Sequence, residues 1–273
     1  MTQKPLTASN SPSQYSGGIT LKSKEELNLM HEAGIIVGTV LGNLKLYAEV
    51  GMTTQELDDI AEKKIRLMGG LPVFKGYMGF PSTICASINE EIVHGIPDNR
   101  IIKNGDILTV DCGASVGGYI GDAAITFQIG KSTKISQNLI KITNESLNIG
   151  INQVKVGGHV GDIGYAISSF AEKKGYGIVR NYVGHGVGKH LHEDPQVPNY
   201  GIKGTGPELK DGMVIAIEPM LTEGKPETEI LADNWTVITK DNSLSAHFEH
   251  TVSITNDGPV ILTKIPEFME SIK

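Results

Sequence analysis

The sequence contains little of what several classes of protein depend on. Only two cysteines occur among its 273 residues, and neither Cys85 nor Cys112 belongs to a CxxC pair, which excludes a disulfide framework and thiolate metal chemistry. No apolar run approaches the roughly 18 residues of a membrane-spanning helix, and the N-terminus lacks the apolar core of a signal peptide. Lys and Arg number 24 against 31 acids, and the resulting net charge of -7 argues against a dedicated nucleic-acid binder. These absences predict a cytoplasmic protein with neither a membrane nor a nucleic acid as its partner.

What is present indicates one compact domain of the size of an enzyme. Hydrophobic residues make up 39% of the chain, enough for a substantial core, and 33 glycines indicate many tight turns. Residues 1–22 are rich in Ser, Thr, Pro and Gln, which is typical of a flexible extension. We therefore expect a single domain over residues 23–273 and assign no activity to the extension.

Helical and strand patterns alternate along the chain. Ser23 can cap a first helix, with Glu26 three residues later as its capping-box partner. The patterns predict helices near 24–47, 53–68, 134–152 and 158–174, and strands or hairpins near 82–93, 106–128, 177–184, 213–222, 234–240 and 246–255. Antiparallel hairpins, rather than crossovers between parallel strands, explain this order, so we expect an α+β fold.

An internal repeat divides the chain into two similar parts. Residues 103–111 align with residues 210–218, because each segment begins with Lys-x-Gly and continues as a strand to an acid. The amphipathic helices upstream repeat at nearly the same spacing. A period this long is too large for a solenoid. It predicts duplicated αβ halves, about 23–133 and 134–265, with pseudo-twofold symmetry and equivalent strands that deliver ligands to a shared centre.

Four carboxylates interrupt segments that otherwise consist of β-branched and apolar residues. They are Asp111, Asp122, Glu218 and Glu249. A carboxylate inside a strand-lined core is strongly disfavoured unless a cation meets it, and no Lys or Arg stands beside any of the four. One such acid alone is more often an edge or turn residue, but the four together with His185 indicate a metal site.

The types of ligand narrow the metal chemistry. Four carboxylates and one imidazole carry more negative charge than one divalent ion needs, which favours two ions that share bridging carboxylates. Oxygen-rich sites with one His suit Mn, Fe, Co or Zn. Paired metals recur in hydrolases because they acidify a bridging water and hold the tetrahedral intermediate. Hydrolysis is therefore the favoured reaction class.

Two registers are open for the hairpin that Asp111 and Asp122 flank. Gly117-Gly118 has the sequence of its turn. A four-residue loop over 115–118 would set the two acids directly opposite each other, whereas a two-residue Gly-Gly turn would set them on a cross-strand diagonal. Both registers keep the carboxylates within reach of shared metals.

Four segments resemble the signatures of one enzyme family. They are residues 87–97 (SINEEIVHGIP), 182–192 (YVGHGVGKHLH), 217–220 (IEPM) and 243–250 (SLSAHFEH). In these segments the chain resembles the type I methionine aminopeptidases of the pita-bread fold, and the resemblance extends from about Ser23 to Thr263. It implies that the ligands of a dinuclear metal centre are Asp111, Asp122, His185, Glu218 and Glu249.

The same resemblance implies roles for further residues. His94 and His192 would contact the substrate and stabilise the reacting amide, while Glu218 would move a proton from the attacking water to the departing nitrogen. The methionine pocket would be lined by Tyr77, Phe80, Cys85 and Trp235, with Phe74 at its rim. Leu191 occupies a position where the family often has Phe, which loosens the pocket without abolishing it. The remaining histidines considered are interpreted as structural, namely His190, His247 and His250.

The implied activity is removal of the N-terminal methionine from nascent proteins and peptides whose second residue is small. One alternative is an Xaa-Pro aminopeptidase or prolidase-like peptidase, but such enzymes usually carry a large additional N-terminal domain. Another is a non-catalytic binding module on the same scaffold, but such relatives have generally lost metal ligands. We expect a monomer that acts on nascent polypeptides. The candidates for a transient ribosome contact are Lys131, Lys134 and Lys141, which are explained better as ordinary solvated helix charges.

Overall fold

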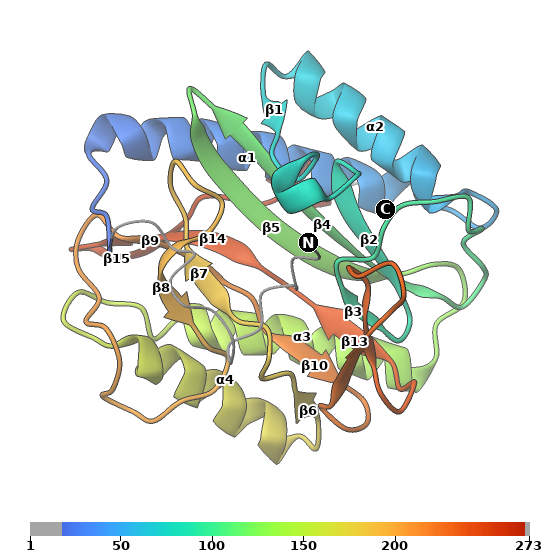
Figure 1. Cartoon of the computed structure of the whole chain (residues 1–273). Helices are drawn as coiled ribbons and strands as arrows, with labels where there is room; N and C mark the ends of the chain where they lie inside the picture. The colour runs from blue at the N-terminus through green and yellow to red at the C-terminus, as the bar shows by residue number, and fades with distance from the viewer. Residues whose placement is uncertain (1–17, 271–273) are drawn as a thin grey trace.

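The computed structural model describes residues 18–270 (Figure 1). The helices are α1 (Lys24–Tyr47), α2 (Thr54–Leu67), α3 (Lys134–Ile151), α4 (Val160–Lys173) and the short α5 (Glu267–Glu270), with one 3₁₀ turn, η1 (Tyr77–Gly79). The strands are β1 (Leu71–Pro72), β2 (Ile84–Ile88), β3 (Glu91–Val93), β4 (Ile107–Val116), β5 (Tyr119–Gln128), β6 (Gly177–Ile178), β7 (Gly184–Gly186), β8 (Glu193–Val197), β9 (Val214–Ile217), β10 (Met220–Thr222), β11 (Thr228–Ile230), β12 (Val237–Thr239), β13 (Ser245–His247), β14 (His250–Thr255) and β15 (Gly258–Ile261). Every strand pair among the described residues is antiparallel, which confirms the α+β prediction.

Capping and apolar periodicity account for the long helices. Ser23 accepts the Glu26 N–H at 3.3 Å and the Glu26 carboxylate accepts the Ser23 N–H at 2.8 Å, so the predicted capping box begins α1. Thr53 and Glu56 form the same reciprocal pair at the start of α2. Each of the four long helices begins and ends within two residues of its predicted bounds.

The strands lie between two helix pairs. Figure 1 shows α1 and α2 above the strands and α3 and α4 below them, one pair from each half of the chain. Helix α1 packs on β4 and β5, and its backbone lies against residues 262–264. A Cβ added at Gly34 would be 2.2 Å from the Leu262 carbonyl oxygen, so only glycine permits this contact.

The β4–β5 hairpin adopts the two-residue turn. Gly117 and Gly118 have φ angles of 56° and 82°, and Val116 pairs with Tyr119. Two successive positive φ angles fit a turn whose twist matches that of the strands. Asp111 therefore pairs with Ala124 and Asp122 with Gly113, so the two acids lie on the cross-strand diagonal.

The two repeat segments begin corresponding strands. Gly105 and Gly212 have φ angles of 102° and 83°, and they turn the chain into β4 and β9 respectively. Asp111 lies within β4, whereas Glu218 directly follows β9. The repeat thus brings one acid from each half of the chain to the middle of the molecule.

Several segments predicted as strands or hairpins each correspond to two short strands. Segments 82–93, 177–184, 213–222 and 246–255 overlap β2 and β3, β6 and β7, β9 and β10, and β13 and β14 respectively. Pro219 breaks the third segment because proline has no N–H to donate to a neighbouring strand. Strands β1, β8, β11 and β15 were not predicted, and β8 contains Asp194-Pro195, a sequence that argues against a strand.

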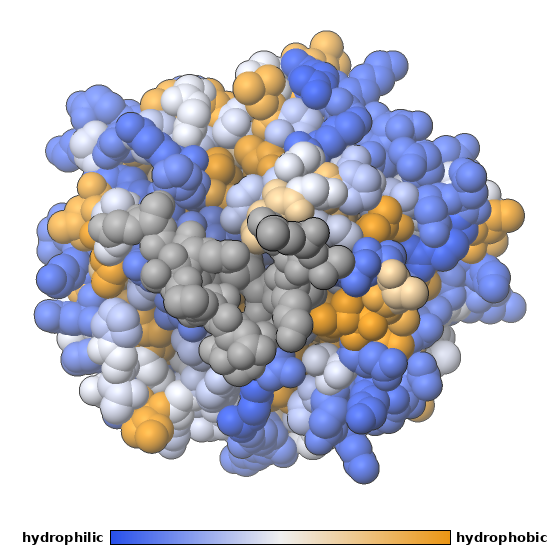
Figure 2. All heavy atoms as spheres, in the orientation of Figure 1, coloured by the Kyte–Doolittle hydropathy of each residue, from blue (hydrophilic) through white to orange (hydrophobic). Residues whose placement is uncertain are grey.

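The described surface is mainly hydrophilic in the orientation of Figure 2, with smaller hydrophobic areas between the polar ones. Among the residues from 18 to 270, no helix has the length and hydropathy needed to cross a bilayer. Residues 1–17 of the predicted extension lie outside the described residues. At the end of that extension, Lys22 is buried.

Candidate metal centre

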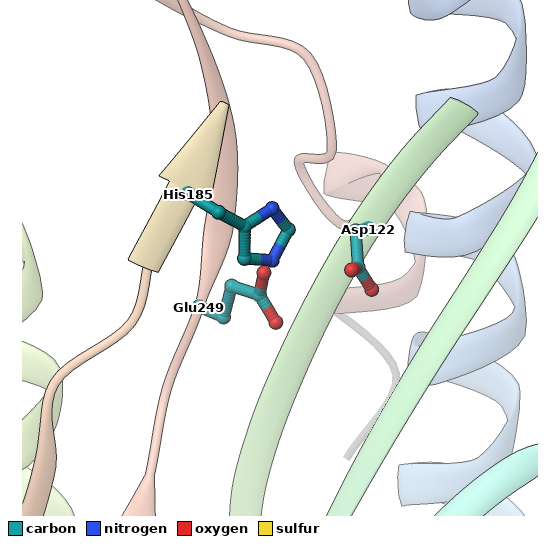
Figure 3. Close-up of side chains that lie close together, drawn as sticks. All are labelled: Asp122, His185 and Glu249. Carbon is teal, nitrogen blue, oxygen red and sulfur yellow. The ribbon is translucent and has the colours of Figure 1, made fainter. Parts of the chain in front are cut away.

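Three of the predicted ligands converge in the interior. Asp122 on β5, His185 on β7 and Glu249 between β13 and β14 place one potential ligand atom each within 4.8 Å of the others. Figure 3 shows their side chains pointing toward one another from three separate chain segments. Their exposed fractions are only 4%, 3% and 2%, so water does not solvate these polar groups.

The other two predicted ligands adjoin this group. The carboxyl of Asp111 interacts with that of Asp122. Glu218 Oε1 lies 3.6 Å from His185 Nε2, and the charge of Glu218 acts on both Asp122 and Glu249. The structure therefore brings together all five residues that the sequence suggested as ligands.

Hydrogen bonds to the backbone of β5 hold β14 and the residue before it against β5 at this point. The Asp122 N–H donates to the Thr251 hydroxyl at 2.9 Å, and that hydroxyl donates back to the Asp122 carbonyl at 2.7 Å. The Glu249 N–H donates to the Ala124 carbonyl at 2.9 Å. These bonds explain how residues far apart in sequence place two carboxylates side by side.

The carboxylates lack a cationic partner. Burial raises the pKa of Asp111 to about 7, and burial and mutual repulsion raise the pKa values of Asp122, Glu218 and Glu249 well above their ordinary values. Among residues 18–270, buried oxygens of Asp111, Asp122 and Glu249 find no hydrogen-bond partner. Within residues 18–270, no Lys or Arg forms an ion pair with any of the four acids. Divalent cations would supply the missing charge, so the residues fit a metal centre.

The hydrogen bond of His185 Nδ1 leaves the other ring nitrogen, Nε2, available to bind a metal ion. Its Nδ1 donates to the Gly186 carbonyl at 2.9 Å, so in the neutral ring Nε2 carries the free lone pair. Burial lowers the pKa of His185 to about 4, which keeps the ring neutral near pH 7. Nε2 is also the atom nearest to Glu218.

His94 and His192 lie beside the cluster. The His192 ring centroid is 4.3 Å from that of His185, and its Nδ1 is 2.7 Å from the Tyr77 hydroxyl. His94 has a φ of 60°, and its buried Nδ1 lacks a hydrogen-bond partner in the part of the chain that the structure describes. Burial lowers the pKa of His94 to about 4 and that of His192 well below its ordinary value. Both rings are therefore neutral near pH 7.

The predicted pocket residues lie together beside these histidines. Phe80 and Trp235 make an edge-to-face contact with centroids 5.1 Å apart, and the Trp235 centroid is 6.3 Å from that of His94. Cys85 pairs with Asp111 across β2 and β4, which joins the pocket to the carboxylates. The same apolar cluster contains Phe74, Phe80, Cys85 and Leu191, with Tyr77 and Trp235 packed against it.

A cavity of about 320 Å³ opens next to this cluster. Its lining consists of Val73, Tyr77, Ile120 and residues 189–192. His192 and Tyr77 belong to both the cavity and the group around the carboxylates. A substrate chain could therefore extend from the cluster into this cavity.

His247, expected from the sequence to be structural, lies beside the carboxylate cluster. It is 1% exposed, and neither ring nitrogen has a hydrogen-bond partner within residues 18–270. Its Nε2 is 3.7 Å from Glu218 Oε2. Its spacing of two residues from Glu249 was a usable signal, because alternate residues of an extended chain face the same side. His250, in contrast, is bonded through Nδ1 to the Thr263 hydroxyl at 3.0 Å.

A buried group of carboxylates with one neutral imidazole, beside an apolar pocket, defines a metal-dependent hydrolase. Residues 28–256 match metallopeptidase family M24, and the chain belongs to this family. It is 50% identical over 246 residues to the methionine aminopeptidase of Clostridium acetobutylicum, covering 90% of this chain and 98% of that protein. The alignment therefore includes residues from both halves of the fold.

Solved structures agree with the fold. The crystal structure of methionine aminopeptidase from Thermotoga maritima is similar to the chain at a TM-score of 0.89 and 41% identity, covering 90% of this chain and 100% of that one. The prolidase from Pyrococcus furiosus is similar at a TM-score of 0.73 and 23% identity, covering 89% of this chain and 65% of the prolidase. The second likeness concerns the fold alone, and together they confirm the predicted pita-bread fold.

Proposed function

We propose that this protein is a methionine aminopeptidase, which removes the N-terminal methionine from nascent proteins and peptides when the second residue is small. The observation that carries the proposal is the buried cluster of unpaired carboxylates beside an aromatic-walled pocket. The identity of 50% to a methionine aminopeptidase over 90% of the chain supports the same reaction.

Divalent metal ions are the cofactors. The residues proposed to hold two of them are Asp111, Asp122, His185, Glu218 and Glu249. Bound ions would polarise the scissile carbonyl and acidify a water for its attack. Carboxylate and imidazole ligands accommodate Mn, Fe, Co or Zn, so the ligand set does not select one metal.

His192 is proposed to donate a hydrogen bond to the scissile carbonyl oxygen. If the Tyr77 hydroxyl donates to Nδ1, the neutral ring carries its hydrogen on Nε2. That hydrogen would stabilise the negative charge that develops on the oxygen in the transition state. The proposed partner of the amide nitrogen is His94, whose buried Nδ1 has no hydrogen-bond partner among the described residues.

Glu218 is proposed to transfer the proton from the attacking water to the departing nitrogen. Its carboxylate lies between two imidazoles, with Oε1 3.6 Å from His185 and Oε2 3.7 Å from His247. Both imidazoles have lowered pKa values because they are buried, about 4 for His185 and about 3 for His247, so neither competes for the proton near pH 7.

The proposed methionine pocket combines Tyr77, Phe80, Cys85 and Trp235. Aromatic edges and faces make favourable contacts with a thioether sulfur, and apolar burial favours an unbranched, flexible side chain. Phe80 and Trp235 supply two such rings in edge-to-face contact. Leu191 is shorter than an aromatic residue, which leaves more room at the cavity side of this pocket.

The alternative activities are not favoured. The prolidase comparison reaches only 23% identity, and the chain covers 65% of that enzyme. A binding module without catalysis would not need a buried carboxylate cluster in which oxygens of Asp111, Asp122 and Glu249 are unpaired within the described residues, because such burial is unfavourable without cations.

A monomeric state and a transient ribosome contact are further parts of the proposal. Lys131, Lys134 and Lys141 are exposed, as a contact with ribosomal RNA requires. Light scattering after gel filtration tests the first, and co-sedimentation with ribosomes at two salt concentrations tests the second, since phosphate contacts weaken with salt.

The main experiment measures free methionine released from Met-Ala-Ser and from an Xaa-Pro peptide. The purified protein is treated with chelator, the chelator is removed, and each divalent metal is added back. We expect release from Met-Ala-Ser only, and only after metal is restored. Cleavage of the Xaa-Pro peptide alone would refute the proposed specificity, and full activity without metal would refute the metal requirement.

A further inference from the structure

The loop that carries His192 is held from its inner side by a buried carboxylate. Glu193 follows His192 directly, and its side chain is 5% exposed. Its Oε1 accepts the His190 N–H at 3.2 Å. A Cβ added at Gly188 would lie 2.4 Å from this same oxygen. The carboxylate therefore fills the inside of the turn at residues 188–193.

The other oxygen of Glu193 is bound by the chain segment that precedes α1. Lys22 Nζ lies 2.8 Å from Glu193 Oε2, and the Thr20 hydroxyl donates to this oxygen at 2.7 Å. The Lys22 side chain is also 5% exposed, and its Nζ donates to the Thr20 hydroxyl. Its backbone N–H donates to the Gly212 carbonyl at 2.7 Å. Figure 1 shows this segment running from α1 toward β9.

The pairing keeps Glu193 ionised inside the protein. Burial opposes the charge, but the hydrogen bonds from Lys22 and Thr20 outweigh it and hold the pKa of Glu193 below its ordinary value. A buried ion pair is weak evidence for a contribution to the stability of the fold, because well-packed apolar residues in its place often stabilise a protein as much. The pair fixes the orientation of the Glu193 carboxylate, because each of its two oxygens has its own set of hydrogen-bond donors.

The loop itself carries the groups near the reacting amide. Its first residue accepts a hydrogen bond from the Ile120 N–H at 3.0 Å, through the Gly188 carbonyl. Between this anchor and Glu193 lie residues 189–192, which line the cavity and include His192, whose ring centroid is 4.3 Å from that of His185. A displaced loop would therefore move the imidazole of His192 relative to the carboxylate cluster.

We propose that Glu193, bound by Lys22 and Thr20, is a positioning residue that fixes the 188–193 loop so that His192 meets the scissile carbonyl. The inference rests on the role proposed above for His192. It also assigns a task to residues 20–22, because the segment before α1 acts through Glu193 on the reaction. Neither Lys22 nor Thr20 touches the substrate in this scheme.

Two variants disturb this support in different ways. Lys22→Met removes the cation, and Gly188→Ala places a Cβ against Glu193 Oε1 without changing any charge. We expect both to lower kcat by about 10- to 100-fold, since misplacement of a reacting group by about 1 Å can cost 10²-fold. KM for Met-Ala-Ser and bound metal, measured by elemental analysis, should stay near the wild-type values. Lys24→Met, the same change at an exposed residue two positions on, is the matched control and should keep wild-type kcat.

A double-mutant cycle with His192→Ala decides whether the effect passes through His192. In the His192→Ala background, Lys22→Met should lower kcat less than about 2-fold, because the group it positions is already absent. Equal losses in both backgrounds, or wild-type kcat in a folded Gly188→Ala variant, would overturn the inference. If Lys22→Met does not fold, the same cycle with Gly188→Ala gives the answer. Absence of methionine release by the metal-loaded wild-type protein would instead overturn the proposed function, and this inference with it.

Discussion

Replacing Asp111 by asparagine should stabilise the metal-free protein while abolishing its activity. The Asp111 carboxyl is buried, and one of its oxygens has no hydrogen-bond partner among the described residues. Burial raises its pKa from 3.8 to about 7. Between these two pH values the unfolded chain has lost the proton that the folded protein still holds, so the free energy of unfolding falls as pH rises. At about 1.36 kcal/mol per pH unit, the loss approaches about 4 kcal/mol above pH 7. Asparagine has no charge to bury and escapes this loss.

The expected gain at pH 8 is about 2 to 4 kcal/mol, or about 5 to 15 °C in the unfolding temperature of a domain of this size. At pH 4 the gain should vanish, since Asp111 is then protonated in the folded protein. Metal-free wild type, Asp111→Asn and the exposed control Asp257→Asn are compared by thermal unfolding at both pH values. The reasoning fails if Asp111→Asn is no more stable than wild type at pH 8, or if the gain is as large at pH 4.

Three other predictions concern catalysis. Glu249→Ala should leave a folded protein that binds less metal and releases no methionine, so normal metal content with retained turnover would contradict its proposed role as a ligand. His94→Ala and His192→Ala should keep the metals but lower kcat by about 10²-fold or more, as measured by methionine release and elemental analysis, and loss of metal would show that they are ligands instead. In a Met-X peptide panel, Gly, Ala, Ser and Thr at the second position should be cleaved well, whereas efficient cleavage of Met-Lys or Met-Phe would contradict a confined site between His94 and His192.

The helices and the central hairpin could be predicted because local interactions decide them. Capping side chains at Ser23 and Thr53 and the apolar periodicity beyond them lie within a few residues of each other. The turn at Gly117-Gly118 needs two positive φ angles, which glycine adopts without strain, although the sequence left its register open. The candidate ligands could also be recognised from the sequence, because burying a carboxylate within an apolar strand is unfavourable unless a cation meets it.

The sequence alone therefore determined the long helices and the α+β class, and it indicated which acids are candidate metal ligands. Tertiary structure decided how these acids meet, because hydrogen bonds such as that between Asp122 and Thr251 join residues far apart in the chain. It also decided the place of His247 beside Glu218 and of Lys22 beside Glu193. Neither pairing can be read from the sequence, although the spacing of His247 from Glu249 hints at a shared side of the chain. The paired groups become neighbours only when separate strands and the segment before α1 pack around one centre. The energy of a buried charge depends on the groups that surround it in the folded protein, and its neighbours in the sequence do not determine which groups these are.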